Sequence, residues 1–491
     1  MKPTVFPHDT YQTFVLEQLQ EHYGRSIIHL SQDWPLILKC WQADLSGITG
    51  QLMEQYADQG PEPRDPASML RSYLVFLFTN PGIGITQWIN EMKRTPIYAI
   101  LSGFSPDDIP GVGTFYEFIE RLWPEATKNL KPKKQKPKKN KKKGQKGKKG
   151  QKANYKPGKV ERFARWSERH MDIVKPLPGD PLFQFFEQNI LKVSADLGLI
   201  GDPDALSVAG DGTPVVTQAY RRSKPTCDCR ANGIYGCHHH RIYSQPDCDG
   251  GWDSSREKYF NGYHLYMLAA ADSPHDLPLY PRLHPASRHD AVSLVASAVE
   301  FNQRYTLGSV NRMLLDAAHD AEAIYELLDK QGTEPFIDLN NRSKKNIETN
   351  SDIQISPEGI PICPNGREMK PNGFDKSQNR RKWRCTPSCG CSDATYGRTY
   401  HTKSSDNLRL FPKTPRDSQA WKDIYKRRTS SERTNKREKN DYQLEAGRHR
   451  STMMWYMRIY GIMICQHIDA WYESQKDDWN QLKTTICPAA A

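Results

Sequence analysis

The sequence predicts an α/β fold in which helices flank a mixed sheet with loop insertions, preceded by a helical N-terminal domain. Three observations support this prediction. Beyond residue 200, short apolar runs typical of strands alternate with helical runs, residues 1–127 carry helical patterns, and a lysine-rich run separates the two parts. Strands that alternate with helices are typical of sheets covered by helices. With 491 residues, the chain is long enough for two or three domains.

Helical patterns begin near the N-terminus. The segment PASMLRSYLVFLF starts with Pro66, and proline is favoured in the first turn of a helix. The segment TQWINEMKRTPIYAILSGF ends beside Gly103, a suitable C-cap residue. A third amphipathic segment, VGTFYEFIERLW, follows. Together these segments predict a helical domain over residues 1–127.

A lysine-rich segment divides the chain. Residues 131–159 contain fifteen lysines and no acidic residue, so the net charge of +12 falls to −3 without them. A segment with almost no apolar residues cannot offset the entropy of folding. We therefore expect a disordered linker over residues 128–160. It could be a solubilising spacer or an arm that binds the phosphates of nucleic acid.

The larger part of the chain, residues 161–476, has an alternating pattern. The predicted order is three strands, a helix, a strand, a helix and a strand, followed by an insertion and a long helix. The predicted strands lie in the segments 206–220, where the strand reaches Asp211, and 258–272, 276–285, 311–320 and 334–340. The predicted helices between them are 291–305 and 321–332. Two cysteine-rich insertions are expected, at about 221–257 and 340–420.

Three acidic residues stand out in this region. Asp211 is expected at the end of the first strand, Asp316 follows the apolar part of the fourth, and Glu432 lies on the late helix. A carboxylate at the end of a buried strand is costly unless it is paired or binds a metal. Oxygen ligands of this kind suit Mg²⁺ or Mn²⁺, and two such ions can stabilise phosphoryl transfer.

Glu432 lies in the basic segment YKRRTSSERTNKREK, residues 425–439. At about 100° per residue of a helix, Tyr425, Arg428, Glu432 and Lys439 fall within an arc of about 60°. This stripe predicts a site where a carboxylate binds a cation while basic and phenolic groups hold an anion.

The spacing Tyr425-x2-Arg428-x3-Glu432-x6-Lys439 resembles the Y-R-E-K signature of bacterial insertion-sequence DDE transposases. Two further segments are similar to that family: VAGDGTPV resembles its first catalytic strand, and RMLLDAAHDAEAIYELL resembles its second. The resemblance implies an RNase H-like core and, from DPASMLRSYLVFLF and IPGVGTFYEFIERL, a helical N-terminal domain. This domain could bind DNA, or its helices could simply pack together. The catalytic acids would be Asp211, Asp316 and Glu432. Asp320 is the alternative to Asp316, which directly follows the apolar strand.

The resemblance also implies partners and cofactors. Arg428 and Lys439 would contact DNA phosphates, and Tyr425 would pack or hydrogen-bond at the strand being cut. Two Mg²⁺ or Mn²⁺ ions would bind the three acids, and the protein would act as a homodimer assembled on double-stranded DNA. Hydrolysis at the element's end would release a 3′-OH, which would attack a second phosphate. Two alternatives remain: a nuclease of the same fold that does not join DNA, and a non-catalytic DNA-binding relic.

Eight of the eleven cysteines form two groups. The first contains Cys227, Cys229, Cys237 and Cys248 near His238, His239 and His240, and the second contains Cys363, Cys385, Cys389 and Cys391. Thiols grouped in this way predict structural Zn²⁺ sites, although neither group contains a C-x2-C pair. Free buried thiols are the alternative.

The C-terminal segment STMMWYMRIYGIMICQHIDAWYE is predicted to be a helix whose apolar face closes the core. Arg458, His467 and Asp469 interrupt it, which argues against a membrane span. Residues 477–491 would form a tail, and Trp252 is expected to be buried. Together with an N-terminus unlike a signal peptide, these features predict a cytoplasmic protein associated with the nucleoid.

Overall fold

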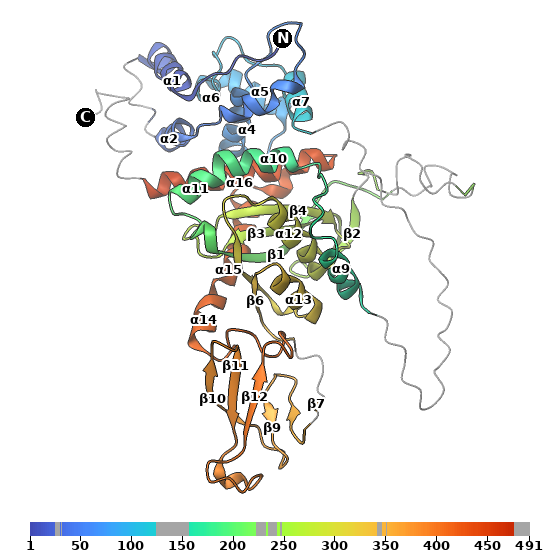
Figure 1. Ribbon diagram of the computed structural model, residues 1–491. Helices are drawn as coiled ribbons and strands as arrows, with labels where there is room; N and C mark the ends of the chain where they lie inside the picture. The colour runs from blue at the N-terminus through green and yellow to red at the C-terminus, as the bar shows by residue number, and fades with distance from the viewer. Residues whose placement is uncertain are drawn as a thin grey trace.

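The computed structural model describes residues 1–24, 30, 32–123, 157–221, 232–233, 243–245, 248–340, 346–349 and 351–475. Most of the predicted lysine-rich linker lies outside these residues, as do Cys227, Cys229, Cys237 and the predicted tail. Helix α9 (Lys159–Glu168) begins within the last two residues of that linker. Figure 1 shows the N-terminal helices, the central sheet and a smaller β-rich insertion in succession along the molecule.

The N-terminal region is helical, as predicted. Its helices are α1 (His8–Tyr23), α2 (Trp34–Gln42), α3 (Gly47–Leu52), α4 (Pro66–Thr79), α5 (Ile85–Arg94), α6 (Pro96–Ser102) and α7 (Val112–Arg121). Asp65 caps α4 by accepting a hydrogen bond from the backbone N–H of Ser68 at 2.8 Å. Gly103 ends α6 in the left-handed conformation, with φ at 91°. The single helix expected up to Gly103 is divided at Thr95, because Pro96 disfavours helical geometry in the residue before it.

The central sheet contains both parallel and antiparallel strands. They are β1 (Leu206–Val216), β2 (Asp249–Asp253), β3 (Lys258–Ala270), β4 (Pro278–Pro285), β5 (Val310–Leu315) and β6 (Glu334–Ile337). The order is β2-β3-β1-β5-β6, and β4 also pairs with β3. Strand β1 is antiparallel to β3 and parallel to β5, which is parallel to β6. This mixed sheet with flanking helices is consistent with an RNase H-like core and confirms the predicted fold class.

Three details of the sheet differ from the prediction. Strand β1 continues five residues beyond Asp211, because Gly212 to Val216 remain paired with β3. Strand β2 is an additional strand within the first predicted insertion. Trp252 on β2 is 53% exposed, since it lies on the outer face of an edge hairpin beside the exposed ring of Tyr259. The expectation of a buried Trp252 is therefore wrong.

Helices cover the sheet. Helix α12 (Asp290–Arg304) crosses from β4 to β5, and α13 (Glu322–Lys330) crosses from β5 to β6. Helix α9 packs against both of them. Helix α10 (Asp180–Phe186) continues through a wider turn into α11 (Lys192–Asp196). Helix α14 (Gln419–Tyr425) and helix α15 (Thr429–Asn440) lead to the last helix, α16 (Thr452–Ser474).

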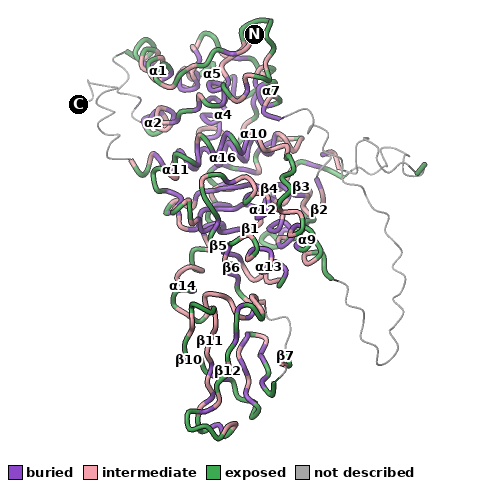
Figure 2. The backbone as a smooth tube through the Cα atoms, in the orientation of Figure 1, coloured by how far each residue is buried: buried purple, intermediate pink, exposed green. Residues whose placement is uncertain are grey.

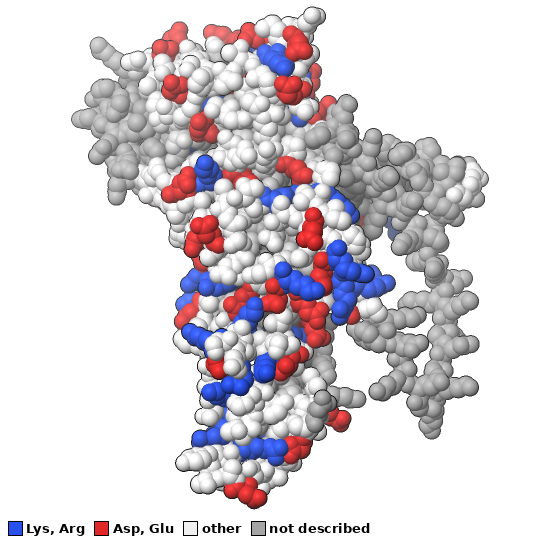
Figure 3. All heavy atoms as spheres, viewed as in Figure 1, with Lys and Arg blue, Asp and Glu red and all other residues white. Residues whose placement is uncertain are grey.

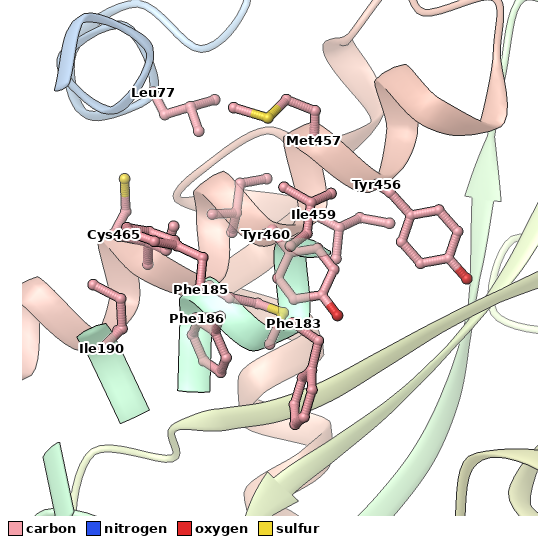
Figure 4. Close-up of a cluster of buried hydrophobic side chains, with 14 of the residues drawn as sticks. Leu77, Phe183, Phe185, Phe186, Ile190, Tyr456, Met457, Ile459, Tyr460 and Cys465 are labelled. Atoms are coloured by element: carbon pink, nitrogen blue, oxygen red, sulfur yellow. The ribbon is translucent and has the colours of Figure 1, made fainter. Parts of the chain in front are cut away.

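Helix α16 is buried on nearly all sides, as the purple tube in Figure 2 shows. It packs against α4 and α2 of the N-terminal region and against β4 and α10 of the sheet region. In Figure 4, side chains of α16 such as Met457 and Tyr460 lie between Leu77 of α4 and Phe183 of α10. The sequence predicted one apolar face on this helix, but apolar residues lie all around it, because the N-terminal helices cover one side and the sheet region covers the other. Among the described residues, no helix is long and apolar enough to cross a membrane.

The second insertion forms a small β-rich unit between β6 and α14. Its first sheet contains β7 (Ile347–Glu348), β8 (Gln354–Ile355) and β9 (Pro361–Ile362). Its second sheet contains β10 (Lys370–Asp375), β11 (Arg380–Arg384) and β12 (Thr399–Lys403). A core of its own, which includes Ile353, Met369, Trp383 and Leu410, holds the two sheets together.

Candidate active site

Asp211 lies in the middle of β1, at the centre of the sheet. Its carboxylate accepts a hydrogen bond from Nδ2 of Asn435 on α15, at 3.3 Å. Burial raises the pKa of Asp211 to about 6. The negative charges of Asp290 and Asp316 add to this increase, while a hydrogen bond from the backbone N–H of Gly212 opposes it. Asp211 is therefore a partly buried acid whose charge no cationic side chain pairs directly within the described residues.

Asp316 directly follows β5, as predicted. Its Oδ1 accepts a hydrogen bond from the backbone N–H of Ala318 at 3.1 Å and lies 2.5 Å from Nδ1 of His319. His319 is buried, and its other ring nitrogen lies 2.9 Å from the hydroxyl of Tyr266. Burial raises the pKa of Asp316, but the hydrogen bond with His319 and the nearby charge of Arg428 lower it below the usual value. The carboxylate is thus held in place and ionised.

The alternative residue, Asp320, has a different environment. Its side chain is fully buried, and Arg409 binds both of its oxygens at 2.8 and 2.6 Å. The hydroxyl of Tyr325 and the backbone N–H of Asn340 also donate to it. Asp320 is therefore occupied by protein partners, which supports the choice of Asp316 as the acid of the site.

Glu432 lies in the first turn of α15, and its side chain is 49% exposed. Its Oε1 is 2.6 Å from Nη1 of Arg428, which is mostly buried. Burial lowers the pKa of Arg428, but the pairing with Glu432 and the nearby Asp316 raise it above its usual value. Arg428 thus lies between the second and the third predicted acid.

Tyr425 and Lys439 lie at different places along the same segment. Tyr425 stacks on Trp421 with ring centroids 4.3 Å apart, and the guanidinium of Arg428 lies 5.9 Å from its ring centroid. Lys439 is largely buried, and its Nζ is 3.7 Å from Glu445. A 3-10 turn at residues 426–428 separates α14 from α15, so the stripe predicted on one continuous helix is interrupted. Tyr425, Arg428 and Glu432 nevertheless remain neighbours.

Several residues of the site were not predicted from the sequence. Asp290 begins α12, and its Oδ1 is 2.7 Å from Nε2 of His264 on β3. The pair lies beside Gly212, where a Cβ atom would be 2.3 Å from the Asp290 oxygen and 2.4 Å from the His264 ring. Gly212 is thus needed to seat this pair next to Asp211. His319 lies in the quoted segment after Asp316, but a histidine three residues after an aspartate is too common to be a signal.

The carboxylate oxygens of the three acids are suitable ligands for a divalent cation. They lie farther apart in this structure than the ligands of a single bound ion do. Asp211 and Asp316 offer carboxylate oxygens, and each is near a second negative charge that a cation would offset. Within the described residues, the only group of three or more His, Cys, Asp or Glu side chains whose ligand atoms all lie within 4.8 Å of one another is formed by cysteines. Glu432 is paired with Arg428 instead.

That cysteine group is Cys363, Cys385, Cys389 and Cys391, the second predicted set. Cys385 directly follows β11, Cys389 and Cys391 lie in the loop before β12, and Cys363 follows β9. Burial raises the pKa of Cys363, but hydrogen bonds from the backbone of Arg367 and from Cys389 lower it to about 7. Four thiols at this separation match the ligands of a structural zinc site. Of the first set, only Cys248 is described, and it is buried.

Comparison with known proteins identifies the family of this chain. The family model described as the transposase DDE domain matches residues 208–466, more than half of the chain. The match begins in β1, three residues before Asp211, and ends in α16, so it includes all three predicted acids. A search of curated proteins found no match. The chain belongs to the transposase DDE domain family.

Proposed function

We propose that the protein is the transposase of a bacterial insertion sequence, which cuts DNA at the element's ends and joins the ends to a target. Asp211, Asp316 and Glu432 would be the catalytic acids. The observation that carries the proposal is the environment of Asp211, a partly buried carboxylate on the central strand with Asp316 and Asp290 close enough to raise its pKa. Such an arrangement costs stability, and perturbed acids of this kind are concentrated at functional sites.

The residues of the chain have separate tasks in this proposal. Asp211, Asp316 and Glu432 hold two Mg²⁺ or Mn²⁺ ions, and His319 fixes the orientation of the Asp316 carboxylate. When bound, such ions stabilise the charge on the attacking and leaving oxygens of a phosphodiester. Arg428 is paired with Glu432 at present. In the DNA complex it would turn toward a phosphate, and Glu432 would be released toward the aspartates.

Tyr425 and Lys439 are proposed to hold the DNA on either side of Glu432. The Tyr425 ring is fixed by Trp421, so its hydroxyl would be presented at a defined position beside Arg428. Lys439 is 18% exposed in its side chain, and its contact with Glu445 would be exchanged for a phosphate. The substrate would be double-stranded DNA held by a homodimer.

We also infer that Cys363, Cys385, Cys389 and Cys391 hold a structural Zn²⁺. The core of the insertion is small, and units of this size commonly need a metal or a disulfide for stability. The site would fix the end of the β11–β12 hairpin, because three of its ligands lie in or beside the loop that joins the two strands.

The proposal is tested by removing each acid without changing its shape. Asp211→Asn, Asp316→Asn and Glu432→Gln should each reduce Mg²⁺-dependent cleavage of an element end at least ~100-fold, equivalent to about 3 kcal/mol in the barrier. Binding of the same DNA, measured by gel shift, should change little. Asp320→Asn is the matched control: it should retain cleavage but lose roughly 1.5–3 kcal/mol of stability, since Arg409 loses its charged partner.

A nuclease that does not join DNA would give the same cleavage results, whereas a non-catalytic relic would not. Cleavage that survives in one of the three variants would remove that residue from the site. Absence of cleavage in the unmodified protein, with DNA binding retained, would favour the relic.

A further inference from the structure

The sheet of β10, β11 and β12 in the insertion has two different faces. On the inner face, Trp383 of β11 donates from Nε1 to Oγ1 of Thr402 on β12, at 2.9 Å, and packs in the core of the insertion. Arg381 lies on this face as well, paired with Asp417 and 4.5 Å from the Trp383 ring centroid. A cavity of about 410 Å³ adjoins these side chains.

The outer face carries cations at the alternate positions of β11, which are Arg380, Lys382 and Arg384. Residues directly opposite each other in paired strands point to the same face. Arg380 is opposite Lys403, Lys382 is opposite His401, and Arg384 is opposite Lys370. We call Lys370, Arg380, Lys382, Arg384 and Lys403 the basic face. In Figure 3, Lys and Arg side chains lie along the lower part of the molecule, where Figure 1 places this sheet.

Like charges directly opposite each other destabilise a sheet, so this arrangement requires an explanation. Among the described residues, only Arg380 of the basic face has an acidic partner, Asp375 at 3.4 Å. The pKa of His401 is lowered by the same cations. Burial is the largest cause of the decrease, and the positive charges of Arg380 and Lys382 add to it. The sheet thus carries a cluster of cations that the insertion itself does not neutralise.

We infer that the basic face binds the phosphate backbone of double-stranded DNA. The inference rests on the proposed action on DNA and adds a contact surface outside the catalytic region. Alternate residues of one strand are about 6.8 Å apart and neighbouring strands about 4.8 Å apart, so the cations form a flat array suited to a regular polyanion. Among the described residues, this face exposes no Phe, Tyr or Trp ring, whereas surfaces that bind single strands commonly stack bases on such side chains.

The test compares full-length proteins that differ by two charges. Lys382→Gln with Lys403→Gln removes cations from the basic face, and Lys370→Gln with Arg384→Gln is a second, independent pair. Lys175→Gln with Lys192→Gln is the matched control, since both lysines are exposed and precede β1. Binding to a duplex of element-end sequence and to an unrelated duplex is measured at four or more salt concentrations.

Both basic-face variants should bind the two duplexes more weakly and to the same extent, because phosphate contacts carry no sequence information. The slope of log K against log salt should become shallower by about 0.9 for each lost contact, thus by up to about 1.8. The control should keep the original slope. Lys382→Arg with Lys403→Arg should keep it as well, because both charges remain.

The melting temperature separates a binding role from a structural one. Removal of repelling cations should leave it unchanged or higher, while a structural role would lower it. Unchanged affinity and slope in both basic-face variants would overturn the inference, and would point instead to an acidic protein as the partner. Binding is measured without Mg²⁺ and with the catalytic acids intact. The result therefore does not depend on whether the protein cleaves DNA, and the inference can fail without the proposed function failing.

Discussion

At the scale of single residues, Glu438 shows how burial controls charge near the site. It lies on α15, one residue before Lys439, and is 1% exposed. Neither of its oxygens has a hydrogen-bond partner among the described residues. Burial raises its pKa to about 8, although the charges of Lys439 and Arg437 oppose the increase. Glu438 is therefore protonated in the folded protein at neutral pH.

This raised pKa predicts a dependence of stability on pH. A glutamate in the unfolded chain has its ordinary pKa of 4.5, whereas burial raises the pKa of folded Glu438 to about 8. The folded state thus binds more protons between these limits, and stability falls as pH rises through them. Glu438→Gln should remove this loss and stabilise the protein by roughly 3 kcal/mol at pH 7, with little effect at pH 4.5.

Urea denaturation of the two proteins at pH 5, 6, 7 and 8 measures the effect. The difference in the free energy of unfolding should grow over this range. Parallel pH profiles for the two proteins would show that Glu438 is ionised in the folded state or has a partner that lowers its pKa.

The residues also show where sequence reasoning succeeds. The position of Asp316 after β5 followed from the apolar run before it. Asp290 and His264 could not be found in this way, because their proximity to Asp211 arises from the pairing of β1 with β3 and from the start of α12. Contacts of this kind depend on tertiary structure and leave no local pattern.

At the scale of elements, the apolar patterns predicted β1, β3 to β6, α12 and α13, but not β2 or the helices α9, α10 and α11 that precede the sheet. The predicted end of β1 at Asp211 was wrong because GTPVV can pair with β3 despite its glycine and proline. The late basic segment is helical, but α14 and α15 meet at a 3-10 turn that a helical wheel does not reveal. The short strands of the insertion were not predicted individually, because only a few apolar residues around the cysteines form the core against which these strands pack.

The cysteine group gives the prediction that belongs to this scale. If Cys363, Cys385, Cys389 and Cys391 hold zinc, protein purified without added metal should contain about one zinc ion per chain. Cys389→Ser with Cys391→Ser should lose this ion and expose the insertion to proteolysis, because the binding energy of a structural metal is also folding energy.

Elemental analysis and limited proteolysis measure the two effects. Cys40→Ser is a suitable control, because Cys40 is buried in the N-terminal region and outside the group. A metal-free protein with a stable, protease-resistant insertion would contradict the zinc site.

At the scale of the whole molecule, α16 joins the two regions that the lysine-rich segment separates in sequence. Apolar residues of the N-terminal helices, of α10 and of the sheet form one continuous cluster around it. The sequence predicted an apolar helix here, but the layer on its second side was not predictable, because no local pattern shows that α4 returns to cover it. The N-terminal helices therefore lie at a fixed position relative to the sheet.

The two regions that are proposed to contact DNA are close together along the chain. Tyr425, Arg428 and Lys439 lie along the segment that carries Glu432, and the basic face lies on the insertion between β6 and α14. The chain thus enters the insertion from β6 and leaves it into α14, and a 3-10 turn then joins α14 to α15, which bears Glu432. A DNA duplex bound to the basic face would therefore be held by a part of the chain that is joined to the proposed catalytic segment through α14.

Asp211, Asp316 and Glu432 are proposed to form one site that both cuts and joins DNA. The most direct test is strand transfer with pre-cut element ends, in Mg²⁺, into a target duplex. Ends that carry a 3′-OH should be joined by the unmodified protein, while ends blocked at that hydroxyl should not. Glu432→Gln should join neither. Protein that cleaves but fails to join free 3′-OH ends, or joining by the Glu432→Gln variant, would contradict the account.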